Sequence, residues 1–266
     1  MTAYYNEINK HAAQWLRNLI ARGLIAPGDV DERSILEVKP DDLRSYTQCH
    51  FFAGIGGWSH ALRLAGWPDD RPVWTGSCPC QPFSVAGSQR GCEDERHLWP
   101  AFFGLIRECR PPSVFGEQVA GASGLAWLDH VCADLEVEGY AAAAADLPAC
   151  STGAPHQRQR LFWVANAQGE RGRRGETMAR QTGEELGRPS QNLCRDAWPD
   201  GYGSGSAIPV GDVCSASYGI PGRVGRLRAY GNAIVPQVAA VFVMANAESS
   251  TPQGVTRTPG YRARTN

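Results

Sequence analysis

The sequence has no hydrophobic run long enough to cross a membrane and no basic-then-apolar leader at its start. None of its 266 residues falls in a stretch approaching the roughly 20 apolar residues that a spanning helix needs. Residues 1–10 are largely polar. We therefore expect a cytoplasmic protein with no membrane partner, and the length favours one sizeable core plus a small accessory lobe.

A paired-cysteine pattern is also missing. The nine cysteines are odd in number and scattered, which favours a reducing compartment over a disulfide framework. Cys78 and Cys80 form a C-P-C sequence, but no second pair stands at metal-ligand spacing, so we expect no metal. Free thiols remain available for chemistry.

Strong net charge is absent too. The 26 basic and 27 acidic residues give a formal charge of −1, which argues against a uniformly basic surface for nucleic acid. That average hides two arginine-rich segments, at residues 158–195 and 223–228. Arginine suits phosphate oxygens and guanine edges, although an ordinary solvated loop explains the same composition.

Strand-like and helix-like patterns alternate along much of the chain. This alternation predicts an α/β fold with a mostly parallel sheet and helices on both faces. The expected strands cover residues 4–8, 28–30, 49–53, 73–76, 113–116, 140–146 and 161–165, and the main expected helices cover 12–20, 58–65, 98–109, 124–138 and 237–246.

The pattern breaks after residue 165, where glycine, arginine, serine and glutamate dominate. We expect residues 1–165, completed by 224–246, to form the catalytic and cofactor-binding domain. Residues 166–223 are the candidate target-recognition region, and 247–266 are expected to be a disordered tail.

Two loops carry the candidate chemistry. Phe51–Gly57 (FFAGIGG) follows an expected strand and opens a helix, a geometry that brings backbone close to a nucleotide-like ligand. It differs from the G-x-G-x-x-G fingerprint, so a plain tight turn is the alternative. Cys80 stands in a proline-flanked loop at the end of another strand, and a nucleophilic role requires a thiol pKa below its free value of about 8.5.

Five segments, taken together and in order, resemble the C5-cytosine DNA methyltransferase family. Each piece alone is only suggestive, but the set is specific and spans most of the chain. The segments are FFAGIGGW (51–58), PCQPFS (79–84), GEQVA (116–120), PHQRQRLF (155–162) and GNAIVP (231–236). The resemblance implies a Rossmann-like, S-adenosylmethionine-dependent methyltransferase fold.

By this resemblance, Cys80 adds to C6 of a flipped cytosine and makes C5 reactive toward a sulfonium methyl. Glu117 matches the glutamate that hydrogen-bonds the N3 edge. Arg158 and Arg160 match the paired arginines that hold the base and orient the glutamate. A purely structural Glu-Arg ion pair is the alternative for these three residues.

The resemblance also implies the cofactor contacts. The glycine turn, the start of the cysteine loop and two later segments match the pocket for S-adenosylmethionine, through Phe52, Gly54, Ile55, Gly56, Gly57, Pro79, Leu98, Asn232 and Ala233. The family's acidic residues for ribose and adenine do not follow the turn here, because little chain separates Gly57 from Cys80.

Similar segments stand upstream instead. Glu7 and Ile8 resemble the ribose-binding strand, and Asp29 and Val30 resemble the adenine-binding one. We expect both strands to lie beside the glycine-turn strand, since a ligand contacts strand ends in space whatever their order in the chain. Right-handed connections then predict that the helix after Gly57 lies on the opposite sheet face from helix 12–20. The alternative is that residues 1–46 are an unrelated extension.

Single positions depart from the family pattern: Asn9, His50, Gln118 and His156 stand where Asp, an acidic residue, Asn and Gln are usual. They affect positioning rather than reaction type. The expected partner is duplex DNA, bound by a monomer, with a base extruded from the stack. Candidate DNA contacts are Gln81, Ser84, Arg90, Arg173, Arg174 and Arg223.

Two other functions remain open. An RNA cytosine methyltransferase would use the same nucleophile, and a degenerate family member would bind DNA without turnover. The intact set of Cys80, Glu117, Arg158 and Arg160 favours an enzyme. The recognition sequence and the biological role, whether restriction protection, phage evasion or regulation, do not follow from the sequence.

Overall fold

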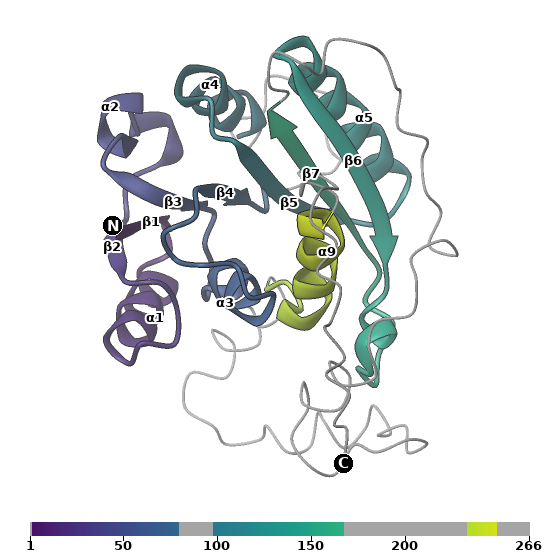
Figure 1. Ribbon diagram of the computed structural model, residues 1–266, viewed down its shortest axis with the longest axis horizontal. Coiled ribbons are helices and arrows are strands. Elements are labelled where there is room, and N and C mark those ends of the chain that lie inside the picture. The colour runs from purple at the N-terminus through teal and green to yellow at the C-terminus, as the bar shows by residue number, and fades with distance from the viewer. Residues whose placement is uncertain (1, 80–97, 168–232, 249–266) are drawn as a thin grey trace, which may run out of the picture.

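The computed structural model describes residues 2–79, 98–167 and 233–248. Within them the chain forms one mixed sheet covered by helices (Figure 1). The strands are β1 (Thr2–Asn6), β2 (Gly28–Asp31), β3 (Tyr46–Phe51), β4 (Val73–Gly76), β5 (Ser113–Val119), β6 (Tyr140–Leu147) and β7 (Arg160–Ala167). The helices are α1 (Lys10–Ala21), α2 (Pro40–Leu43), α3 (Gly57–Leu64), α4 (Trp99–Cys109), α5 (Ala122–Val137) and α9 (Pro236–Glu248), with short 3-10 turns η1 (Ile35–Glu37) and η3 (Ala149–Thr152).

The strand order is β2-β1-β3-β4-β5-β7-β6. The first five strands in that order are mutually parallel, and β7 runs antiparallel between β5 and β6. The predicted α/β class with a mostly parallel sheet is confirmed. As predicted, the two upstream strands lie beside the glycine-turn strand, because β1 pairs with β3 and β2 pairs with β1.

Alternating side chains of the sheet fill two apolar layers. One face, including Tyr4 of β1 and Trp74 of β4, packs under α2, α4 and α5. The other face, including Tyr5 of β1 and Phe115 of β5, packs under α1, α3 and α9. Successive residues of a strand point to opposite faces of the sheet, and here both faces carry apolar residues, as a parallel sheet covered on both sides requires.

The predicted face of α3 is wrong. Tyr5 packs against Leu16 of α1, and its hydroxyl hydrogen-bonds Ser59 Oγ of α3 at 2.9 Å, so both helices cover the same face. The connections β1-α1-β2 and β3-α3-β4 run in opposite directions across the sheet, so they have opposite hands. Packing outweighs the right-handed preference here, because Trp58 and Leu62 of α3 bury their side chains in the layer formed with α9.

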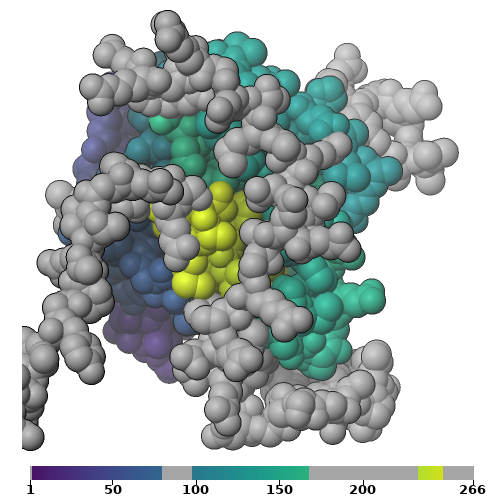
Figure 2. Space-filling view, turned by 45° about the vertical axis from the view of Figure 1, so that its right-hand side comes forward, coloured from purple at the N-terminus to yellow at the C-terminus, as the bar shows by residue number. Residues whose placement is uncertain are grey.

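Helix α9 closes this layer. It packs against α3, and its Val238 and Phe242 are buried in the same cluster as Phe115 and Phe162. Figure 2 shows α9 at the surface between α3 and the β6 side of the molecule. The last helix of the described chain thereby brings residues 233–236 next to the glycine turn.

Most of the predicted recognition region and tail, at residues 166–223 and 247–266, lies outside the described residues, and the domain division stays a prediction. In the parts of the chain that the structure describes, no helix combines the length and apolarity of a membrane span.

Candidate active site

The candidate site lies where the parallel strands end. The turn after β3, Glu7 after β1, Ser77 after β4 and Glu117 near the end of β5 all come from the carboxyl ends of adjacent strands. In an open α/β sheet this edge is where ligands bind. Segments far apart in the sequence thus meet at one edge.

The glycine turn between β3 and α3 is tightly bent. Phe52, Gly54 and Gly56 have φ angles of 52°, 55° and 83°, which lie in the left-handed region. A Cβ at Gly57 would lie 2.7 Å from Cγ1 of Ile234, the residue that precedes α9 by two positions. The turn therefore touches the segment before α9 with no room for a side chain. Ile55 is half-buried in this turn.

Glu7 reaches the glycine turn from β1. Its Oε2 accepts a hydrogen bond from the backbone N–H of Gly54 at 2.7 Å, and its Oε1 accepts one from the N–H of Asn9 at 2.8 Å. The next residue, Ile8, leaves 68 % of its surface exposed although it is apolar. This edge therefore offers a carboxylate that accepts hydrogen bonds and, next to it in sequence, an exposed apolar side chain.

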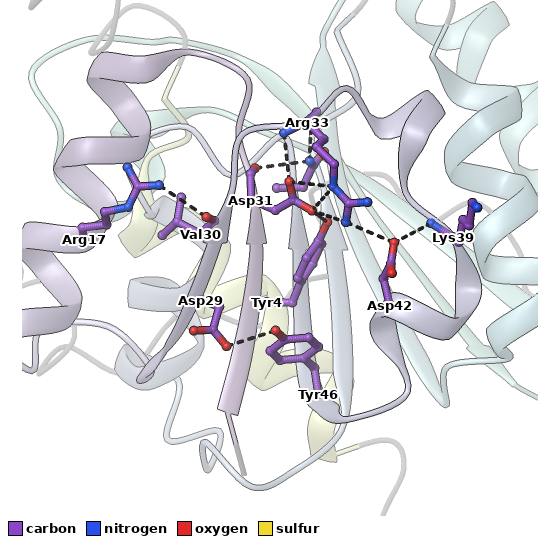
Figure 3. Close-up of polar contacts among 10 residues, drawn as sticks. Tyr4, Arg17, Asp29, Val30, Asp31, Arg33, Lys39, Asp42 and Tyr46 are labelled. Atoms are coloured by element: carbon purple, nitrogen blue, oxygen red, sulfur yellow. Dashed lines mark hydrogen bonds and ion pairs between the residues drawn. The ribbon is translucent and has the colours of Figure 1, made fainter.

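The edge strand β2 presents two aspartates on one face (Figure 3). Asp29 pairs with Tyr4 in register and accepts a hydrogen bond from the Tyr46 hydroxyl at 3.0 Å, so it lies back from the strand end. Asp31 pairs with Asn6 and occupies the carboxyl end. Val30, between them, faces the α1 layer.

Asp31 is held by a network of polar contacts. It accepts hydrogen bonds from the Tyr4 hydroxyl at 2.8 Å and from Arg33 Nη2 at 2.7 Å, and Arg33 also pairs with Asp42 at 3.0 Å (Figure 3). Burial alone would raise the pKa of Asp31, but the Arg33 and Tyr4 hydrogen bonds outweigh it and lower the pKa. The sequence alone did not single out Asp31, since only the register of β2 on β1 places it at the cofactor edge.

The buried Glu117 forms an ion pair with the partly exposed Arg160 between β5 and β7. Arg160 Nε lies 2.9 Å from Glu117 Oε1, and Glu117 is only 8 % exposed. Burial raises the pKa of Glu117, and the two arginines and the Ser77 hydroxyl partly offset that rise. A carboxyl group that is easily protonated and aimed from a strand end is suited to donate a proton to a ring nitrogen.

Arg158 stands in the loop before β7 with a φ angle of 33°, an uncommon value for a residue with a side chain. Its Nη2 donates a hydrogen bond to the carbonyl of Ala233 at 2.6 Å. Burial, followed by the nearby positive charge of Arg160, lowers the pKa of Arg158. The predicted arginine pair is therefore assembled beside Glu117, and it connects to the segment before α9.

Three residues that the sequence analysis did not assign to the site also meet here. Trp58 Nε1 donates a hydrogen bond to Ser77 Oγ at 3.0 Å, and the register of β4 on β5, with Gly76 opposite Gly116, places Ser77 beside Glu117. Gln118 Nε2 donates to the carbonyl of Cys78 at 3.3 Å, which ties β5 to the loop that leads to Cys80. The only sequence signal for Ser77 was its position directly after a strand.

Several predicted residues cannot be placed. Pro79, which is exposed, is the last described residue before the nucleophile loop, and Leu98 precedes α4 and packs against the main core cluster. Cys80, Gln81, Ser84, Arg90, Arg173, Arg174, Arg223 and Asn232 lie outside the described residues.

Comparison with known proteins finds sequence similarity to one enzyme family over part of this chain. Residues 67–193 match the family model described as C-5 cytosine-specific DNA methylase. The type II methyltransferase M.AgeI of Thalassovita gelatinovora is 37% identical over 107 residues, which cover 39% of this chain and 25% of that protein. The type II methyltransferase M.CviJI of Paramecium bursaria Chlorella virus IL3A is 34% identical over 158 residues, covering 46% of this chain and 43% of that protein.

This chain thus spans less than half the length of these relatives. Among solved structures, a DNMT2 variant of Spodoptera frugiperda aligns with a TM-score of 0.46 and 15% identity, covering 67% of this chain and 46% of that one. Residues 67–193 of this chain are thus similar in sequence to the C-5 cytosine-specific DNA methylase family, and parts of the chain are similar to type II methyltransferases.

Proposed function

We propose that this protein is a DNA (cytosine-5-)-methyltransferase that modifies a flipped cytosine in duplex DNA. The observation that carries the proposal is the ion pair of the buried Glu117 with Arg160 on β5 and β7, beside the β4 strand that leads into the Cys80 loop. In the family pattern these residues are the acid, the base clamp and the nucleophile. The names of the relatives support a role in restriction-modification.

In the proposed reaction, the Cys80 thiolate attacks C6 of the extruded base. Glu117, which burial makes easy to protonate, donates a hydrogen bond or proton at N3 and so prevents negative charge from building on the ring. Arg160 keeps the Glu117 carboxyl in place, and Arg158 braces the loop through Ala233. The activated C5 is then ready for alkylation.

We propose that the residues at this strand edge bind S-adenosylmethionine. The left-handed glycine turn, the Glu7 carboxylate at Gly54 and the exposed Ile8 form a cradle for the donor's amino-acid, ribose and adenine parts. When bound, S-adenosylmethionine would supply the electrophilic methyl group. We assign the ribose to Glu7 and the adenine edge to β2, where Asp31 occupies the carboxyl end of the strand and the predicted Asp29 stands two residues before it.

The direct test measures transfer of a radiolabelled methyl group from S-adenosylmethionine to duplex DNA and, separately, to transfer RNA. We expect labelled 5-methylcytosine in DNA only, and bisulfite mapping of DNA from expressing cells then identifies the site. A product confined to transfer RNA would replace the proposal by RNA modification.

The nucleophile is tested with a duplex that carries 5-fluorocytosine, which traps the covalent adduct after methyl transfer. We expect trapping by the wild-type protein and by Cys150→Ser, which alters an exposed cysteine. Cys80→Ser should bind DNA but form no adduct. Equal trapping by Cys80→Ser would refute the role of this cysteine.

A further inference from the structure

Ser77 lies between the indole of Trp58 and the carboxyl group of Glu117. Trp58 Nε1 donates to Ser77 Oγ at 3.0 Å. Gly76 pairs with Gly116 in the parallel register of β4 and β5, so Ser77 and Glu117, which directly follow them, lie side by side on the same face of the sheet. This proximity lets the Ser77 hydroxyl act on the Glu117 carboxyl, and it lowers the pKa of Glu117. The three residues come from α3, the end of β4, and β5. They form a continuous polar chain from the start of α3 to the proposed catalytic acid.

The direction of this chain follows from the donors and acceptors. An indole N–H can only donate, so Ser77 Oγ must accept from Trp58. The Ser77 hydroxyl hydrogen then points elsewhere, and an ionised carboxylate can only accept. The hydrogen bonds therefore run from Trp58 to Ser77 to Glu117, and Ser77 favours the charged form of Glu117.

The surroundings of this chain limit what could replace it. Trp58 is 5 % exposed and Glu117 is 8 % exposed, so water has little access to either end. The Trp58 ring packs at 6.2 Å from the ring of Phe115 and 6.1 Å from that of Phe162. A hydrogen bond between such confined groups is stronger than one in water and holds a single geometry.

Trp58 is also the second residue of α3, directly after the glycine turn. Gly57, its neighbour, touches Ile234 before α9. The position of the Trp58 indole is thus set by the same turn that forms the cofactor cradle. Because Ser77 is held by the Trp58 indole, its orientation toward Glu117 depends on the same turn.

We propose that Ser77 is a positioning residue, which aligns the Glu117 carboxyl from the cofactor side while Arg160 aligns it from β7. This inference rests on the proposed function. Among the described residues, the charged groups facing Glu117 are Arg160 on β7 and Arg158 in the preceding loop, whereas β4 contributes the neutral Ser77. Ser77 therefore sets the orientation and the proton affinity of the Glu117 carboxyl without adding a charge.

The first experiment reads the protonation of Glu117 without requiring turnover. Infrared difference spectra against Glu117→Gln isolate the carbonyl stretch of the protonated acid over a pH titration. Ser77→Ala should raise the pKa of Glu117, because one donor to the carboxylate is lost. Ser77→Thr keeps the hydroxyl and should return the pKa toward the wild-type value.

The second experiment measures methyl transfer. We expect Ser77→Ala to lower kcat about tenfold, the loss typical of one misaligned hydrogen bond to a charged group, and to leave the KM for S-adenosylmethionine within about twofold. In the plot of kcat against pH, the fall in rate on the alkaline side should shift to higher pH. Ser77→Thr should recover most of the rate.

Trp58→Phe tests the other end of the chain. It removes the donor that orients Ser77 and should lower kcat about threefold, whereas Ser77→Ala combined with Trp58→Phe should match Ser77→Ala alone. Trp67→Phe is the matched control, because Trp67 is in the same apolar cluster but donates to the carbonyl of Arg71. Ser113→Ala controls for loss of a hydroxyl on β5.

An unchanged Glu117 pKa and unchanged kcat in Ser77→Ala would overturn the inference, as would full additivity of the two substitutions. A wild-type protein without methyl transfer would instead overturn the proposed function. The infrared titration separates the two cases, since it reports on Ser77 and Glu117 with or without a reaction.

Discussion

His50 provides a sharp test of the packing beneath the glycine turn. It lies in β3, two residues before Phe52, and is 1 % exposed. Its ring stacks on Tyr5 at 4.9 Å, its Nδ1 hydrogen-bonds Thr75 Oγ1 at 2.8 Å, and its Nε2 has no partner among the described residues. A charged imidazolium would therefore be buried with one N–H unsatisfied.

This burial lowers the pKa of His50 to about 3 from the ordinary value of 6.5. Between these values the unfolded chain binds a proton at His50 and the folded chain does not. His50 therefore does not reduce the free energy of unfolding above pH 6.5, and it reduces this free energy progressively as the pH falls from 6.5 to about 3. At pH 5 the loss is about 2 kcal/mol, since each pH unit below 6.5 contributes about 1.4 kcal/mol.

Urea unfolding followed by circular dichroism at pH 7.5 and pH 5 measures this loss. His50→Asn removes the titrating group and keeps a polar atom for Thr75. Between pH 7.5 and pH 5 the free energy of unfolding of the wild type should therefore fall by about 2 kcal/mol more than that of the variant. Other titrating groups are common to both proteins and cancel. Equal losses in the two proteins would refute the argument that the folded chain excludes a proton from His50.

Three further substitutions test the packing and one helix end. A Cβ at Gly116 would lie 2.2 Å from the ring of Trp163, so Gly116→Ala should lower the free energy of unfolding by about 2–3 kcal/mol. The Cβ added by Gly104→Ala in α4 would meet no atom within 4 Å, so this variant should be neutral or slightly stabilising. Thermal melts of both variants compare their stabilities, and similar melting of the two would contradict the packing argument. Asn9 caps α1 by accepting from the N–H groups of His11 and Ala12, so Asn9→Ala should cost about 1 kcal/mol in urea unfolding, and no loss would exclude a stabilising cap.

The sequence by itself determined the local features of this protein. Strand and helix periodicity, the glycine turn and the order of the motifs depend on neighbouring residues, so the α/β class and nearly every described element were predicted. The sequence also predicted that the strands expected at residues 4–8 and 28–30, observed as β1 and β2, join the glycine-turn strand. That prediction was possible because the binding motif of each strand is carried in a few adjacent positions.

Only the tertiary structure decided which groups meet across the sheet. Trp58 and Leu62 place α3 on the face of α1, against the handedness rule, because their burial against residues far along the chain outweighs a local preference. The register of β2 on β1 puts Asp31 rather than Asp29 at the strand end, and a register is set by pairing between strands. The contact of Ser77 with Glu117 likewise requires two strands to lie side by side, which no local sequence pattern encodes.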